Sequence, residues 1–250
     1  MVAEASGRSQ RVHVVTRKEE LDASLLEGKV VVVLDVLFAT TSIVAAFSAG
    51  AREVIPVPDP ESAIVAARQF PPGQVALAGE QHLAPIPGFL GYSPLTLAEE
   101  PLRDKSLVYV TTNGTVALHS AREAAHVYAG SLRNGTALIE HLVESHRHET
   151  LVLVCAGSAG AFNLEDFYGA GYFVDGLVSQ SVERWLPTDA AIAAQEIYRA
   201  NSENPENVML RSSLGRTLSS TEMREDVLYV AQRGVEALVP KLSDGVLRTI

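Results

Sequence analysis

The stretch Lys29-Val-Val-Val-Val-Leu34-Asp35 decides the fold class of this chain. Its short run of β-branched residues is typical of a buried strand, and the run ends at a carboxylate. An apolar helical face over residues 43–47 follows and stops at Gly50, and a second β-branched run begins at residue 54. The pattern therefore predicts a strand, a loop, a helix and another strand, in that order.

The segment Val30–Ala51 carries one charge, Asp35, and is long enough to span a bilayer. Asp35 and the run Thr40-Thr41-Ser42 interrupt it, and a central Asp costs about 2.5–3.5 kcal/mol on membrane-insertion scales. We therefore expect a buried strand and helix here, and no membrane as a partner. Residues 1–10 are polar and small, which predicts no export leader and favours a cytoplasmic location.

The same alternation of strand and helix patterns repeats along the chain. Further strands are predicted at residues 75–78, 107–110, 127–129 and 151–155, and a helix is predicted from about Leu164. Strands that are apolar throughout are covered on both faces, as in parallel sheets. We therefore predict an α/β fold with three α/β/α layers and a mostly parallel sheet.

No linker-like segment divides the chain, so residues 1–250 are predicted to form a single domain. Residues from about 185 to 250 are richer in helical patterns and are expected to be an extension packed on it. In this extension Ser219 and Glu222 form a capping-box pattern, which predicts the start of a helix. Residues 238–249 predict a closing hairpin.

Composition limits the classes of partner. The chain has 30 acidic and 20 basic residues and a formal net charge of -10, which disfavours nucleic acid because a phosphate backbone requires a basic face. The single cysteine, Cys155, excludes an internal disulfide and is expected to be a core residue rather than a nucleophile. His146 and His148 alternate with charged residues and predict a solvated helix end. A homo-oligomer is an open alternative to a monomer.

Polar residues gather after the predicted strands, at the sheet edge where α/β proteins bind ligands. Four carboxylates are expected on this edge: Asp35, Glu80, Glu165 and Asp166. Small residues of turns that open helices are expected beside them: Thr40, Thr41, Asn113, Gly114, Thr115, Gly157 and Ser158. Carboxylates bind Mg²⁺ together with water and substrate oxygens, and such turns present backbone N–H groups to phosphate. The combination predicts phosphoryl chemistry on a small anionic substrate.

Each of these features also has a purely structural explanation. Asp35 is compatible with a cap of the loop after its strand, and Glu80 with a surface position. Glu165 and Asp166 are acids that a helix dipole favours in a first turn. Asn113-Gly114 is compatible with a simple tight turn. The joint placement of the four features favours a site.

Several motifs occur in a fixed order: Asp35-Val-Leu with Ala39-Thr40-Thr41, Gly79-Glu80, Gly88-Phe89 with Ser93-Pro94, Thr111-Thr-Asn-Gly-Thr115, and Ala156-Gly157 with Glu165-Asp166 and Ala170-Gly171. From about Val12 to Val246 they resemble the 2-phosphosulfolactate phosphatase family. The resemblance implies a Mg²⁺-dependent acid phosphatase of α/β fold, which hydrolyses 2-phosphosulfolactate to sulfolactate. In methanogens this step belongs to coenzyme M biosynthesis.

The sequence departs from the family pattern at positions where the family usually carries arginine. Phe38, Gln81 and Val116 occupy three of these positions, and Tyr92 occupies the position of the Asn in the family's N-S-P triplet. Arginine is the preferred bidentate partner of phosphate and sulfonate. Its loss is expected to weaken the binding of a doubly anionic substrate by about 1.5–3 kcal/mol per charged hydrogen bond. Phe38, Gln81 and Val116 are expected to face one pocket.

Three hypotheses follow. In the first, a Mg²⁺-dependent phosphomonoesterase acts on 2-phosphosulfolactate or a related small 2-phospho acid by attack of a metal-activated water. It assigns the metal to Asp35, Glu80 and Asp166, makes Glu165 an alternate ligand or base, and lets residues 113–115 position the phosphate.

In the second hypothesis the same fold binds a less anionic, more apolar molecule, and in the third the protein is a non-catalytic relative. Basic side chains that fill the pocket, with Arg133 and Arg216 as the candidates, would favour the first hypothesis. An apolar cleft would favour the second.

Overall fold

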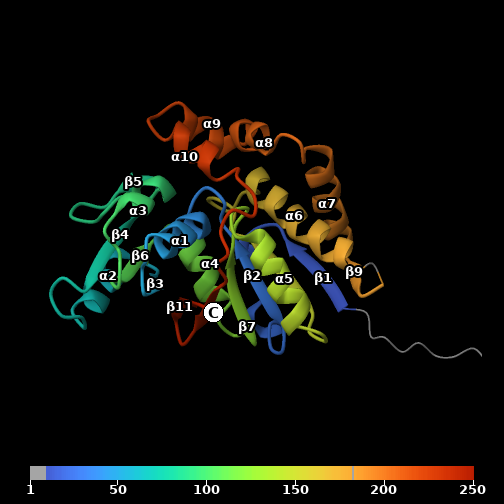
Figure 1. Ribbon diagram of the computed structural model, residues 1–250, viewed down its shortest axis with the longest axis horizontal. Coiled ribbons are helices and arrows are strands. Elements are labelled where there is room, and N and C mark those ends of the chain that lie inside the picture. Colours follow the sequence, from blue (N-terminus) through green and yellow to red (C-terminus); the bar gives the residue numbers. More distant parts are fainter. Residues whose placement is uncertain (1–9, 182) are drawn as a thin grey trace, which may run out of the picture.

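The computed structural model describes residues 10–181 and 183–250, which fold into an α/β structure (Figure 1). The prediction for residues 1–10 lies, apart from Gln10, outside the described residues. The strands are β1 (Gln10–Val15), β2 (Val30–Leu34), β3 (Glu53–Val57), β4 (Val75–Gln81), β5 (Ala84–Pro85), β6 (Ser106–Val110), β7 (His126–Gly130), β8 (Leu151–Cys155), β9 (Trp185–Pro187), β10 (Pro240–Ser243) and β11 (Val246–Thr249). The α-helices are α1 (Ala39–Ser48), α2 (Pro60–Ala67), α3 (Pro94–Glu99), α4 (Gly114–Ser120), α5 (Gly135–Ser145), α6 (Leu164–Gln180), α7 (Asp189–Ala200), α8 (Pro205–Arg211), α9 (Ser213–Ser219) and α10 (Arg224–Tyr229).

The described strands form a sheet in the order β5-β4-β6-β3-β11-β10-β7-β2-β8-β1-β9. It contains two parallel runs, one of β4, β6 and β3 and the other of β7, β2, β8, β1 and β9. The hairpin of β10 and β11 lies between these runs and pairs antiparallel with β7 and β3. The predicted α/β fold with a mostly parallel sheet is therefore confirmed.

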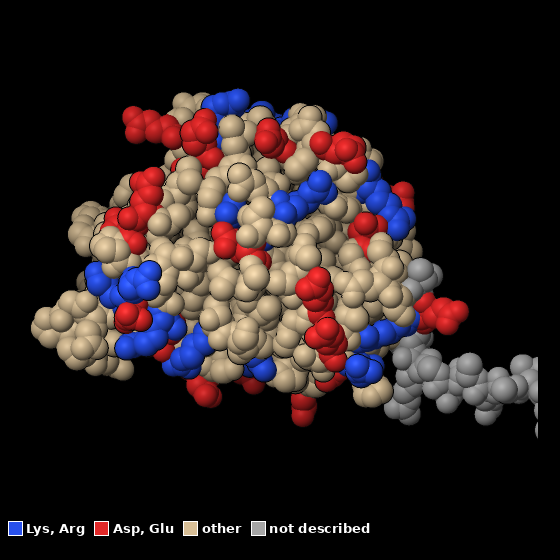
Figure 2. Space-filling model, viewed as in Figure 1, with Lys and Arg blue, Asp and Glu red and all other residues tan. Residues whose placement is uncertain are grey.

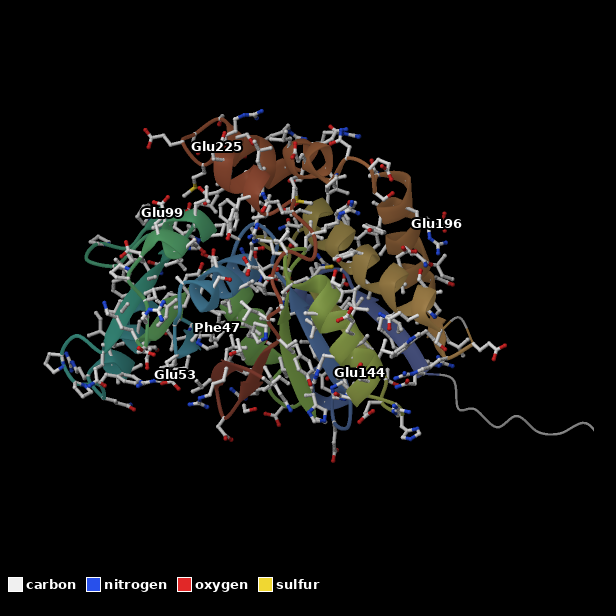
Figure 3. All side chains as sticks on the ribbon, viewed as in Figure 1. Phe47, Glu53, Glu99, Glu144, Glu196 and Glu225 are labelled. Atoms are coloured by element: carbon white, nitrogen blue, oxygen red, sulfur yellow. The ribbon has the colours of Figure 1, made fainter. Side chains whose placement is uncertain are left out.

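The hairpin itself was predicted, but its position in the middle of the sheet was not. Asp244 and Gly245 both have positive φ angles, as a two-residue type I′ turn requires. On the β3 side, Glu53 accepts a 2.7 Å hydrogen bond from the Ser106 hydroxyl and forms an ion pair with Arg248. In Figure 3 Glu53 lies at the lower edge of the molecule, close to where Figure 1 draws β11.

Strand β2 shows why the deciding stretch is apolar at every position. Val31 and Val33 belong to a core that they share with α1 and α4. Val30, Val32 and Leu34 point to the other face, into a core that they share with α5 and α6. Because both faces are covered by helices, the strand has no polar side, and the alternation typical of half-exposed strands is absent.

The segment Val30–Ala51 forms β2, a loop and α1, as predicted. Among residues 10–181 and 183–250, no helix has the length and apolarity needed to cross a membrane. On the face drawn in Figure 2, acidic and basic side chains are interspersed among uncharged ones. The formal charge of -10 is therefore not collected into one acidic region on that face.

Two connections cross between the parallel runs, and they meet at one point. The chain passes from β2 through α1 to β3, and it returns from β6 through α4 to β7. At the start of α4, a Cβ atom on Gly114 would lie 2.4 Å from Ala39 Cβ and 2.7 Å from Asp35 Oδ2. Only glycine allows this approach, so it holds the β2–α1 and β6–α4 loops in direct contact.

The C-terminal third adds strands as well as helices to the fold. β9 pairs with β1, and α7 packs against α6. Helices α8, α9 and α10 lie together at the top of the molecule in Figure 1. The predicted helix start at Ser219 and Glu222 is wrong, because Ser219 ends α9 and α10 begins at Arg224. The Ser212 hydroxyl supplies the cap of α9 instead, accepting a 2.9 Å hydrogen bond from the N–H of Gly215.

Two further sequence predictions have opposite outcomes. Cys155 is a fully buried core residue, as predicted, and burial raises the pKa of its thiol well above the ordinary value. The prediction of a solvated His146 is wrong: it is 5% exposed, and burial, together with the nearby His126, lowers its pKa to about 4. Helix α5 ends at Ser145, so the next residue turns inward against Tyr128. His148 is exposed.

The close approach at Gly114 leads to a test. Gly114→Ala should lower the free energy of unfolding by roughly 1–3 kcal/mol, because its methyl group overlaps Ala39 and Asp35. Adding Ala39→Gly should restore part of the loss. Gly169→Ala is the control, since its Cβ would meet only one atom within 4 Å, Val36 Cγ2 at 3.2 Å. Urea unfolding measures all four proteins, and equal stability of the two single alanine variants would contradict the proposed constraint.

Candidate active site

Two hollows lie at the carboxyl ends of β2, β4 and β6. The inner cavity measures about 20 Å³, and the outer cleft about 370 Å³. Five residues line both of them: Glu80, Leu83, Asn113, Ser158 and Leu214. The inner cavity has room for about one water-sized group, whereas the outer cleft has the size of a small-molecule site. Leu214 and its neighbours on α9 bring the C-terminal helices to the wall of the cleft.

Asp35 lies in the wall of the inner cavity and is 7% exposed. One carboxylate oxygen accepts a long 3.4 Å hydrogen bond from the N–H of Ala39, and the described residues offer no donor to the other. Burial, together with the negative charges of Glu80 and Glu165, raises the pKa of Asp35 to about 7, against the opposing effects of the Ala39 N–H and Lys18. The site therefore holds a carboxyl group that favours a proton or a cation beside it.

Glu80 lines both hollows, but its carboxylate already holds two loops together. Its Oε1 accepts a 2.6 Å hydrogen bond from the N–H of Thr112, and its Oε2 accepts 2.7 Å and 3.0 Å bonds from Leu83 N–H and the Thr112 hydroxyl. The adjoining turn contains His82 and Leu83, which both have positive φ angles. Such angles are unfavourable for residues other than glycine. Glu80 thus stabilises a strained turn at the mouth of the site.

Asp166 connects two other loops from a fully buried position. Its carboxylate accepts hydrogen bonds from Val36 N–H at 2.8 Å and Gly157 N–H at 3.1 Å. Burial raises its pKa well above the ordinary value, with further contributions from Asp35 and Glu165. Because both of its carboxylate oxygens accept backbone hydrogen bonds, Asp166 acts as a brace between the β2–α1 and β8–α6 loops.

Glu165 differs from Asp166 in its hydrogen bonding. It is 1% exposed, and within the described part of the chain its buried Oε1 has no hydrogen-bond partner. Burial also raises its pKa. Within residues 10–181 and 183–250, Asp35 and Glu165 therefore retain oxygen atoms without a donor, whereas both oxygens of Glu80 and of Asp166 are occupied.

These carboxylates do not form a compact triad of ligand atoms. Among the described residues, the one group of three His, Cys, Asp or Glu ligand atoms within 4.8 Å of one another lies elsewhere, at His126, His146 and Glu149. The expected joint ligation of Mg²⁺ by Asp35, Glu80 and Asp166 stays a prediction. Mg²⁺ needs only one or two carboxylates, because it keeps several waters.

The residues expected to bind substrate fall into two groups. The buried hydroxyls of Thr40, Thr41 and Thr115 donate to the backbone carbonyls of their own loops, at 2.8–3.0 Å. The N–H of Gly157 is used by Asp166, and Gly114 borders Asp35. Only two of the seven line the hollows, namely Asn113 and Ser158, and they are joined by a 3.3 Å hydrogen bond from Asn113 Nδ2.

Lys18 is a site residue that the sequence did not reveal. Its Nζ donates a 2.8 Å hydrogen bond to Asn113 Oδ1 and lies 2.9 Å from Glu19 Oε1, with the side chain 11% exposed. It occurs in a charged run, Arg17-Lys18-Glu19-Glu20, which is typical of a solvated surface. Nothing in this local pattern indicates that the 3₁₀ turn at Lys18–Glu20 lies against the β6–α4 loop.

The two arginines expected to fill the pocket do not do so. Arg133 forms an ion pair with Glu236 at 2.9 Å and stacks on Tyr229, so its guanidinium is used by the C-terminal segment. Arg216 is exposed and hydrogen-bonds to the carbonyl of Arg211. The hypothesis that these side chains replace missing arginines is therefore wrong, and Lys18 is the cation beside Asn113 instead.

The prediction that Phe38, Gln81 and Val116 face one pocket is correct only for Phe38. Phe38 lines the inner cavity, with its ring centroid 6.4 Å from that of Tyr92. Gln81 follows Glu80 on a strand, so the two side chains point to opposite sides, and Gln81 is exposed. Val116 lies on α4 and belongs to neither lining.

The fold and the site together define an α/β protein with buried carboxylates and a small-molecule cleft at the carboxyl edge of its sheet. Residues 15–245 match the sequence profile of the 2-phosphosulpholactate phosphatase family. A probable 2-phosphosulfolactate phosphatase of Symbiobacterium thermophilum is 35% identical over 225 residues, which cover 89% of this chain and 95% of that protein. One from Carboxydothermus hydrogenoformans is 36% identical over 216 residues, covering 86% and 87%. The chain belongs to this family, and the resemblance noted in the sequence is confirmed.

The pKa of Asp35 predicts how stability changes with pH. A carboxyl group whose pKa is higher in the folded chain stabilises the fold at low pH, and this contribution is lost as pH rises from the ordinary value of 3.8 to about 7. In the absence of metal, Asp35→Asn should therefore have a larger free energy of unfolding than the wild type near pH 8, by at most about 4 kcal/mol. This difference should become smaller as the pH is lowered toward 4.

Unfolding in urea at several pH values, with a chelator present, measures this difference. Asp104→Asn is the matched control, because Asp104 is exposed and its φ of 62° suits asparagine equally well. A pH-independent difference between wild type and Asp35→Asn would contradict the prediction.

Proposed function

We propose that this protein is a Mg²⁺-dependent phosphomonoesterase that hydrolyses 2-phosphosulfolactate or a closely related small 2-phospho acid. The observation that carries the proposal is the desolvated Asp35 in the wall of an inner cavity, below a cleft large enough for a small substrate. The names of the relatives, probable 2-phosphosulfolactate phosphatases, support the choice of substrate.

The donor set fits a hard divalent cation. In this proposal Asp35 and Glu165 hold the Mg²⁺, because these two carboxylates keep oxygens without a donor among the described residues. Their burial leaves two negative charges poorly solvated, and a cation would relieve this cost. Glu80 and Asp166 would act one step further away, by holding the loops that position Asp35. When bound, Mg²⁺ would supply charge neutralisation and an activated water.

The remaining roles belong to groups at the wall of the cleft. Lys18 donates to Asn113 Oδ1, which fixes the orientation of that amide and directs its Nδ2 toward Ser158. The amide, the Ser158 hydroxyl and the Lys18 ammonium would donate to the phosphate oxygens. Their positions are set before substrate arrives, so little reorganisation is needed as charge develops during transfer. Attack of water on phosphorus then breaks the ester bond and releases the alcohol and phosphate.

A second candidate function is favoured by the apolar part of the inner wall. Leu37, Phe38, Leu83 and Tyr92 line the inner cavity together with the carboxylates. Tyr92 donates a 3.1 Å hydrogen bond to Leu83 carbonyl, and its pKa is raised to about 12 by burial and by Glu80, so its phenol stays neutral. Such a wall suits a ligand with less charge than a phosphosulfonate, which would still bind next to Asp35.

The metal assignment predicts which carboxylates are essential. Phosphate release from 2-phosphosulfolactate should require Mg²⁺, and Asp35→Asn and Glu165→Gln should each lower kcat by at least about 100-fold, since each removes a proposed ligand. Asp104→Asn should keep the wild-type rate. A panel of 2-phospho acids with and without Mg²⁺ measures this. Turnover that does not depend on Mg²⁺ would contradict the metal, and failure with every 2-phospho acid would favour the second candidate function.

The position of Lys18 predicts a substrate-binding role. Lys18→Met should raise KM or lower kcat/KM by roughly 10- to 150-fold, which corresponds to the 1.5–3 kcal/mol of a charge-assisted hydrogen bond. Lys29→Met is the control, because Lys29 directly precedes β2 and lies at the opposite end of that strand from Asp35. Steady-state kinetics with saturating Mg²⁺ compares the two variants. An equal effect of both substitutions would show that Lys18 has no specific role.

A further inference from the structure

A second cluster of potential ligands lies at the amino ends of β7 and β8, the edge opposite the carboxylate site. His126 is the first residue of β7, His146 directly follows α5, and Glu149 precedes β8. One nitrogen or oxygen atom of each lies within 4.8 Å of the other two. Figure 3 labels Glu144 near this lower edge of the molecule, whereas Glu225, on α10, is at the top.

Two imidazole nitrogens in this cluster are buried without a partner. His126 Nδ1 and His146 Nδ1 have no hydrogen bond to any of the described residues, and His146 is 5% exposed. The carboxylate of Glu149 lies 3.8 Å from His146 Nδ1, which is too far for a hydrogen bond. A buried polar atom left unpaired is unfavourable, and a cation bound to both nitrogens would remove this cost.

The other ring nitrogen of His146 is held by a tyrosine. The Tyr128 hydroxyl lies 2.8 Å from His146 Nε2 and 2.9 Å from His141 Nε2, and a hydroxyl can donate to only one of them. If Tyr128 donates to His141 and accepts from His146, the proton of His146 is on Nε2, and Nδ1 presents a lone pair. A hydrogen-bonded second nitrogen is the usual setting of a metal-binding histidine.

The backbone that carries His146 and Glu149 is fixed from two sides. The side-chain amide of Gln10 donates to the carbonyl of His146 at 3.0 Å and to that of Glu149 at 2.8 Å. Arg184 also hydrogen-bonds to the carbonyl of His146. The loop between α5 and β8 is therefore held in position independently of any ligand, as a binding site requires.

We propose that His126, His146 and Glu149 bind a transition-metal cation of the Zn²⁺ class, with water in the fourth position. Two imidazole nitrogens and one carboxylate are typical ligands of Zn²⁺, whereas Mg²⁺ prefers oxygen alone. Ligand atoms around tetrahedral Zn²⁺ are roughly 3.3 Å apart, so small side-chain rotations must close the cluster. The Glu149 side chain, 31% exposed, has room to make this movement.

The bound cation would connect three segments around β2, the strand that directly precedes Asp35. It would join the start of β7, the end of α5 and the entry to β8, and β7 and β8 are the two neighbours of β2. The expected effect is stabilisation of the fold, without participation in phosphate hydrolysis. Because the cluster and the carboxylate site share no residue, this proposal does not depend on the proposed function.

The experiment uses full-length protein without a histidine tag, freed of metal with a chelator and then transferred to buffer with excess MgCl₂. Titration with ZnCl₂ in a calorimeter should show one Zn²⁺ per chain, and Zn²⁺ should raise Tm. Glu149→Gln and His126→Gln should each weaken binding by about tenfold or more. The exposed neighbour His148→Gln is the matched control, and it should bind Zn²⁺ like the wild type.

Co²⁺ gives a spectroscopic readout of the same site. Co²⁺ bound to the wild type should give the visible spectrum of a four-coordinate site, and Glu149→Gln should remove that spectrum. Glu149 is the principal variant, because it is partly exposed and its replacement spares the core. Three results would each overturn the proposal. The first is that the wild type binds no Zn²⁺, the second is that both Glu149→Gln and His126→Gln bind it with wild-type affinity, and the third is that Asp35→Asn loses the binding instead.

Discussion

The contact between Gly114 and the β2–α1 loop is the constraint on which the rest of the structure depends. The chain crosses from one parallel run to the other through α1 and returns through α4. The loops that precede these two helices meet at Gly114, where a Cβ atom would collide with Ala39 and Asp35. This approach brings the end of β2 to the end of β6. The inner cavity, its carboxylate and Asn113 exist at this place because the two loops share it.

Around this contact the protein uses buried carboxylates to hold loops in place. Backbone N–H groups after a strand lack sheet partners, and Asp166 and Glu80 accept hydrogen bonds from such groups on neighbouring loops. Burial and the charges of Glu80 and Glu165 raise the pKa of Asp35. Glu80 therefore both holds two loops together and adds to the affinity of Asp35 for positive charge.

Much of the fold could be predicted from the sequence, because burial on both faces of β2 demands a continuous apolar run. The position of β10 and β11 between the parallel runs could not, since the hairpin pattern contains no information about distant pairing partners. The position of Asp35 at a strand end indicated a place in the site. The sequence alone could not distinguish the bracing carboxylates, Glu80 and Asp166, from the other two. Lys18 could not be predicted either, because only the tertiary structure brings it to the site.

The placement of the hairpin has a consequence for how the sheet is assembled. Residues 240–249 provide the hydrogen bonds that connect the run ending at β7 with the run ending at β3. During synthesis from the N-terminus, both runs are complete as sequence long before these residues emerge, yet they cannot belong to one sheet. Strands β10 and β11 thus decide when the two runs become one sheet, and pairing between strands so far apart in sequence slows folding.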